Sequence, residues 1–152
     1  MRRKPIIILG ISVISVFLLF NIFWYYTTHK LYSPYKTGME KIETFTYCSH
    51  DSENYGYLVG FPAYLHFNTG CLSITNADHN ATLIIWPQYN NKEFEYGVLL
   101  TDLDNQYSIK MTKDGEAINP AEQEIVDENK EIIDKLYDKA ENKWGASVLG
   151  DN

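Results

Sequence analysis

The sequence predicts an α+β fold: an antiparallel β-meander sheet of about five or six strands, packed by one long C-terminal amphipathic helix and preceded by an N-terminal transmembrane helix. An uncharged apolar segment opens the chain, β-branched and aromatic runs alternate with turn residues in the middle, and an acidic segment with helical periodicity follows. The expected parts are a cytoplasmic basic tip (1–5), a transmembrane anchor (6–26), a linker (27–42), an extracytoplasmic α+β domain (43–145) and a flexible tail (146–152).

The N-terminal segment has the length and composition of a membrane-spanning helix. No charged residue occurs from Ile6 to Phe23, and a helix from Ile6 to Tyr26 would span about 31 Å, close to the roughly 30 Å of a bilayer core. A cleaved signal peptide is the alternative, but its apolar core is shorter, about 7–15 residues, and a small-residue cleavage site follows it. Residues 24–32 read WYYTTHKLY, which offers no such site. The sequence therefore predicts an uncleaved signal-anchor.

Charge and aromatic residues at the two ends of this segment predict its orientation. Basic residues at positions 2–4 precede the helix, and such clusters stay on the cytoplasmic side. The aromatic residues 24–26 follow it and suit the outer headgroup layer. We therefore expect a single-pass protein of the cell membrane, with the N-terminus in the cytoplasm and the C-terminal domain outside.

The net charge of the outer part argues against a nucleic-acid partner. The chain has a formal charge of −7, and removing the three basic residues of the tip leaves −10 for Thr27–Asn152. A surface this acidic is repelled by nucleic acid. Residues 27–42 contain Pro34 and Gly38 and show no periodicity, so we expect a linker there.

Six runs rich in β-branched and aromatic residues are the expected strands, and short turn clusters between them favour antiparallel neighbours. These runs are 43–49, 61–67, 70–76, 81–87, 93–101 and 106–112. The run 106–112 alternates apolar and polar residues, so one of its faces is wet, whereas Leu83 to Trp86 are apolar on both faces. We therefore expect a central strand covered on both sides.

A helix beginning after Asn119 is expected to provide that cover. Asn119 suits the N-cap and Pro120 the first helical position. The apolar residues that follow recur at spacings near three and four residues, and Gly145 ends the pattern. The helix is therefore expected to pack on the sheet along one apolar stripe.

The two cysteines, Cys48 and Cys71, are predicted to lie on like, polar faces of their strands. A disulfide is the preferred interpretation, because thiols outside the cytoplasm oxidise. Two separate thiols are the alternative. A zinc site that adds His50 and His66 is a further alternative, but C-x-H and H-x₄-C are not the usual ligand spacings. We therefore expect no metal and no cofactor.

An aromatic-rich segment carries the candidate binding residues. Gly56, Gly60 and Pro62 interrupt the regularity of residues 55–67, so some of its rings are expected to be exposed and to bind a partner; the alternative is that these rings complete the core. The candidate binding residues are Tyr55, Tyr57, Phe61, Tyr64 and His66.

The expected function is that of a non-enzymatic binding or accessory module, held at the membrane by residues 6–26 and engaging a protein or envelope component. A small extracytoplasmic hydrolase or metal-dependent enzyme is one alternative, with Glu93 and Glu95 on one strand face as a paired-carboxylate candidate. An envelope immunity or exclusion factor is another. No catalytic residue is singled out by motif or spacing.

Overall fold

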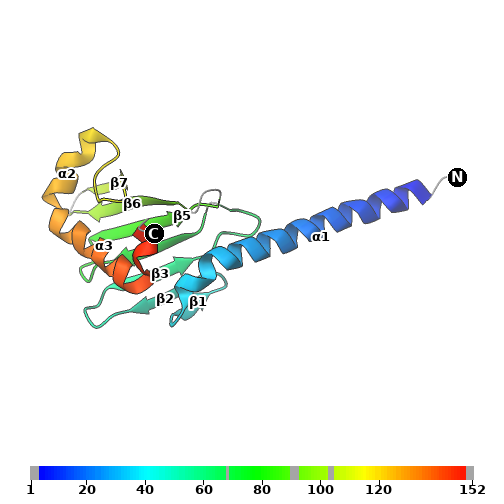
Figure 1. Cartoon of the computed structure of the whole chain (residues 1–152), viewed down its shortest axis with the longest axis horizontal. Helices are drawn as coiled ribbons and strands as arrows, with labels where there is room; N and C mark the ends of the chain where they lie inside the picture. Colours follow the sequence, from blue (N-terminus) through cyan, green and yellow to red (C-terminus); the bar gives the residue numbers. More distant parts are fainter. Residues whose placement is uncertain (1–3, 68, 90–92, 103–104, 150–152) are drawn as a thin grey trace.

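A single antiparallel sheet of seven strands forms the body of the protein, and a long N-terminal helix projects from one end of it (Figure 1). This computed structural model describes residues 4–67, 69–89, 93–102 and 105–149. Neighbouring strands in the sheet are also consecutive in the chain. They are β1 (Glu40–Glu43), β2 (Thr46–His50), β3 (Gly56–Gly60), β4 (Cys71–Thr75), β5 (Ala81–Pro87), β6 (Phe94–Thr101) and β7 (Gln106–Met111). The α+β class and the N-terminal apolar helix are confirmed, while the sheet has more strands than expected.

Two strands differ from the sequence prediction. The run 61–67 forms no strand, and the strand at this point of the meander is β3, which lies before that run, in residues not expected to form a strand. Pro62 cannot donate a ladder hydrogen bond, whereas Tyr57 and Val59 of β3 are buried in the core. The edge strand β1 forms within the expected linker, and its charged residues protect the edge of the sheet from further pairing.

One face of the sheet is covered by helices, and the other is open. Along β5 the burial alternates, with Leu83 and Ile85 buried and Ile84 and Trp86 half-buried. The helix α3 (Lys130–Trp144) contacts β4 and β5 on the buried side through Ile133, Leu136 and Ala140. We expected β5 to be covered on both faces. This is wrong, because Ile84 and Trp86 on the face opposite α3 are only half-buried.

The C-terminal helix is broken, not continuous. Asn119 caps as predicted, because its side chain accepts a hydrogen bond from the backbone N–H of Ala121. A 3₁₀ turn, η2 (Pro120–Glu122), and α2 (Gln123–Glu128) follow, and the chain bends at Asn129 before α3. The Asn129 side chain donates to the Ile125 carbonyl at 2.8 Å, which competes with the helical hydrogen bonds.

The tail also differs from the expectation for residues 146–152. After Gly145 the chain forms η3 (Ala146–Leu149), and Val148 is buried in the core. Residues 150–152 lie outside the described residues. The described part of the tail is thus a packed element.

The N-terminal helix α1 (Lys4–Tyr32) extends well past the expected anchor. Residues 27–32 are helical, so the expected linker begins as a rigid continuation of the anchor, and η1 (Ser33–Lys36) follows directly. Thr28 and Tyr32 are buried against the domain. The indole N–H of Trp144 donates to the Tyr35 carbonyl at 3.0 Å and ties the end of α3 to η1. The helix α1 and the domain are therefore joined by packing as well as by the chain.

Candidate functional site

The five aromatic and histidine residues predicted to bind a ligand do not form one site. They divide between the two ends of β3, which runs from Gly56 to Gly60. Tyr55 and Tyr57 lie at its start, beside α3. Tyr64 and His66 lie beyond its end, in the loop beside α1, and both are exposed. Phe61 is buried between the two groups and belongs to the core.

The end of β3 near α3 holds a charged cluster centred on Asp51. The Asp51 carboxylate accepts hydrogen bonds from the Lys139 ammonium at 2.8 Å and the Tyr57 hydroxyl at 2.9 Å. It also accepts from the backbone N–H groups of Glu53 and Tyr55. The Lys139 ammonium lies 4.7 Å from the centre of the Tyr55 ring. Each charge in this cluster has partners, so the cluster fixes α3 to the β2–β3 turn.

The ionisation of the cluster reflects these hydrogen bonds. Burial raises the pKa of Asp51, but the hydrogen bonds from Lys139, Tyr55, Tyr57 and Glu53 outweigh it and lower the pKa to about 2. Burial and the bond to Asp51 raise the pKa of Tyr57 to about 12. Asp51 is therefore a carboxylate and Tyr57 a neutral phenol across the physiological range, which suits a structural ion pair better than proton transfer.

The other end of β3 continues into a loop that packs against α1. The indole N–H of Trp24 donates to the His66 carbonyl at 2.6 Å. The Trp24 ring lies edge-on to Tyr64, with centroids 5.4 Å apart, and the Tyr64 hydroxyl is hydrogen-bonded to the side chain of Asn21. Phe67 contacts the rings of Phe20 and Phe23, at 6.2 Å from each centroid. Together these rings form an aromatic cluster on one side of α1, which we call the collar: Phe20, Phe23, Trp24, Tyr64 and Phe67.

The two cysteines share a face of the sheet, as predicted, but β3 lies between their strands. Cys48 of β2 is opposite Leu58, and Cys71 of β4 is opposite Gly60. Adjacent strands lie about 4.8 Å apart, so two strand spacings alone exceed the roughly 7 Å limit for Cα atoms joined by a disulfide. Both thiols are free, and burial raises the pKa of Cys71. The structure does not bring the pair together.

The candidate metal and carboxylate residues are also separated. His50 ends β2 at the Asp51 end of β3, whereas His66 lies in the loop beside α1, so the two do not converge. Among the described residues no group of three histidine, cysteine or acidic side chains is placed to hold a metal ion. Glu95 lies exposed in β6 opposite Trp86, and Glu93 precedes the strand and lines a groove.

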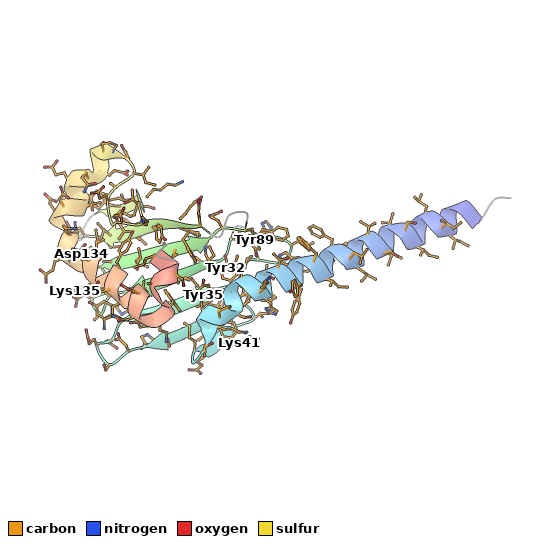
Figure 2. All side chains as sticks on the ribbon, in the orientation of Figure 1. Tyr32, Tyr35, Lys41, Tyr89, Asp134 and Lys135 are labelled. Atoms are coloured by element: carbon orange, nitrogen blue, oxygen red, sulfur yellow. The ribbon has the colours of Figure 1, made fainter. Side chains whose placement is uncertain are left out.

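That groove, of about 460 Å³, lies between α1, η1 and the β5–β6 connection. Lys30 and Tyr35 line one side and Tyr89 lines the other, and Figure 2 shows Tyr32, Tyr35 and Tyr89 gathered where α1 meets the sheet. Burial raises the pKa of Tyr89 to about 12, and its hydroxyl has no hydrogen-bond partner among the described residues. The groove is a small, mixed surface beside the base of α1.

The open face of the sheet is a surface feature that the sequence prediction missed. One row crosses it in register: Cys48, Leu58, Ser73, Ile84, Gly97 and Lys110. None of the positions on this face of β2 to β5 is Asp, Glu, Lys or Arg. A Cβ at Gly97 would lie 2.9 Å from the Trp86 ring, which shows that Trp86 lies flat over β6. The centre of this face is neutral and half apolar, on a domain that is otherwise strongly acidic.

Two sequence signals point to this face. Leu83 to Trp86 are apolar at both odd and even positions, so both faces of that strand are apolar. In addition, no Asp, Glu, Lys or Arg occurs between Glu53 and Asp78. The first signal alone also fits a strand covered by a helix on its second face, which is the arrangement predicted above. Comparison with family models, with curated proteins and with solved structures found no match to this chain.

Proposed function

We propose that the protein is a single-pass, membrane-anchored module that presents the open face of its sheet to a protein partner outside the membrane, and that its role is binding, not catalysis. The helix α1 is long and apolar enough to cross a membrane. The basic residues at positions 2–4 favour a cytoplasmic N-terminus, which puts the domain outside.

The observation that carries the binding proposal is the distribution of charge on the sheet. Protein interfaces are depleted of charged residues at their centre, and the open face of β2 to β5 has no Asp, Glu, Lys or Arg. Half-buried Leu58, Ile84 and Trp86 supply apolar area there. A small ligand would require a concave site with convergent polar groups, whereas a sheet face is broad and suits a protein surface.

Site-specific photo-crosslinking in intact cells tests this proposal. A photoreactive residue at Ile84 is expected to give one defined adduct with a protein, and the same residue at Asp134, on the exposed side of α3, is expected to give none. Adding Leu58→Arg, which places a charge in the cross-strand row, is expected to abolish the Ile84 adduct while the protein stays folded. Identical adducts at Ile84 and Asp134, or none at Ile84, would refute the binding face.

Protease treatment of intact cells tests the orientation separately. The domain after α1 is expected to be digested, because it lies outside. Protection of the domain in intact cells, followed by digestion after lysis, would place it in the cytoplasm.

A further inference from the structure

The surface of α1 is apolar on every side up to the point where the domain begins. All side chains from Ile7 to Phe20 are exposed, and Phe23 is 58% exposed. A helix that is apolar all round is covered by lipid or by protein, and α1 has no protein cover before the collar in the described structure. The position of the collar along α1 therefore shows where protein cover begins.

The collar begins inside the apolar segment, not after it. In the loop after β3, residues 63–67 contact α1 at positions 20–24, through Phe67 on Phe20 and through Tyr64 on Asn21 and Trp24. The outer aromatic residues Tyr25 and Tyr26 come later along α1 and are exposed. The 63–67 loop thus extends back toward the N-terminus of α1, past the residues expected at the headgroup layer.

The length of the apolar part of α1 indicates whether the 63–67 loop lies inside or outside the bilayer core. If the bilayer core ended before the loop, the segment Ile6–Leu19 would have to span it, and its 14 residues are only about 21 Å long. The bilayer core is about 30 Å thick, so this segment is too short by about 9 Å. If the core extends to Tyr26 instead, the contacts at positions 20–24 lie about 3–9 Å below its outer boundary. The loop then lies at the depth of interfacial elements, about 5–10 Å.

The chemistry of the loop suits that depth. Tyr64 and Phe67 present aromatic rings, and Leu65 adds an apolar side chain. No charged residue occurs in the loop. Several of its backbone groups are paired within the protein: the Ala63 N–H donates to Thr69, the His66 N–H to the Ala63 carbonyl, and the His66 carbonyl accepts from Trp24. Internal pairing is what irregular backbone needs near lipid.

We infer that the 63–67 loop inserts into the outer interfacial layer of the membrane beside α1 and holds the domain in one orientation on the bilayer. This inference depends on the proposed crossing of the membrane by α1. The contact with Tyr64 also accounts for Asn21, which is otherwise a polar residue within an apolar segment.

Depth-dependent fluorescence quenching of the full-length protein tests the inference. In a Cys48→Ser, Cys71→Ser background, single cysteines replace Val16, His66 or Asp78 and carry an environment-sensitive fluorophore. His66 is chosen because its side chain is exposed and its contact with Trp24 uses the backbone. Asp78 lies in the β4–β5 turn, at the opposite end of the strands from the loop. The vesicles contain phosphatidylcholine and phosphatidylglycerol, with or without lipid-attached nitroxides.

The inference predicts that the labels at positions 16 and 66 lose most of their emission to the nitroxides and shift to shorter wavelength, and that the label at position 78 does neither. Quenching at 16 but not at 66 overturns the loop insertion and leaves the membrane span intact. No quenching at 16 overturns the span and the inference together. A second loop variant, Ala63→Cys, is expected to behave as His66→Cys, and circular dichroism establishes that each labelled protein is folded.

Discussion

The two ends of β3 hold the sheet to a helix by opposite chemistry. At the end near α3, the Asp51 carboxylate and the Lys139 ammonium form a hydrogen-bonded ion pair. At the end near α1, aromatic rings and the indole of Trp24 make most of the contacts, and Lys36 takes part only through its position 5.3 Å from the centre of the Phe61 ring. A partly exposed ion pair is screened by water and titrates with pH, whereas the packing of aromatic rings does neither. The two ends therefore differ in how strongly their contacts depend on pH.

The largest effect is expected from Gly70→Ala, which tests whether α1 is rigidly packed. A Cβ at Gly70 would lie 2.6 Å from the Tyr32 ring and 2.7 Å from Pro62, and Tyr32 is fully buried. Overpacking of this kind costs about 2–3 kcal/mol, so the thermal unfolding midpoint in detergent should fall by several degrees.

Gly56→Ala at the other end of β3 is the matched control. The atom nearest to a Cβ there is the His50 Nε2 at 3.6 Å, an ordinary contact, so the midpoint should change little. If the two variants were equally stable, the packing of Tyr32 against Gly70 would be looser than described.

Acid titration tests the charged end. The pKa of Asp51 in the folded protein, about 2, is below its ordinary value near 3.9 in an unfolded chain. Its contribution to the free energy of unfolding is therefore present above about pH 4 and is lost as the pH falls toward 2, by up to about 2 kcal/mol. Asp51→Asn removes this dependence, and the difference between the stability curves of wild type and variant from pH 7 to 2 isolates it. Parallel curves would contradict the lowered pKa.

Trp24→Phe tests the hydrogen bond at the end of β3 near α1. The variant keeps an aromatic ring but loses the indole N–H, so the His66 carbonyl loses a donor at 2.6 Å. We expect a loss of about 1 kcal/mol in the free energy of unfolding. Trp86→Phe, on the open face, is the control for loss of an indole and should cost less. A larger loss of stability from Trp86→Phe would indicate that the Trp86 ring is packed within the protein and is not available to a partner.

The parts of the fold that depend on local pattern could be predicted from the sequence. In β7, apolar Ile109 and Met111 alternate with polar neighbours, and both are buried. Asn119 caps through a contact only two residues away. Where the relevant contacts are within a few residues, composition and spacing are enough.

The rest depends on contacts between residues far apart in the sequence. Residues 61–67 have the composition of a strand because their rings pack on α1, as in the pair Trp24 and Tyr64. No local pattern distinguishes that use from sheet pairing. The alternation within each strand predicts that the two cysteines share a face, but a strand between them cannot be inferred without knowing that β3 forms. Likewise, the bend at Asn129 depends on which group its side chain bonds.

The smallest effects are expected from substitutions of two lysines in α3. Lys139 bonds both Asp51 and Glu53, and one fifth of its side chain is exposed. Among the described residues Lys135 pairs with Glu131, four residues earlier, and more than half of its side chain is exposed. Lys135→Ala should leave the unfolding midpoint unchanged, because such exposed pairs contribute little. Lys139→Ala should lower it and raise the pKa of Asp51, since the carboxylate loses its cationic partner. Equal midpoints for the two variants would mean that the aromatic end alone fixes the sheet to the helices, so that the charged end contributes solubility instead of stability.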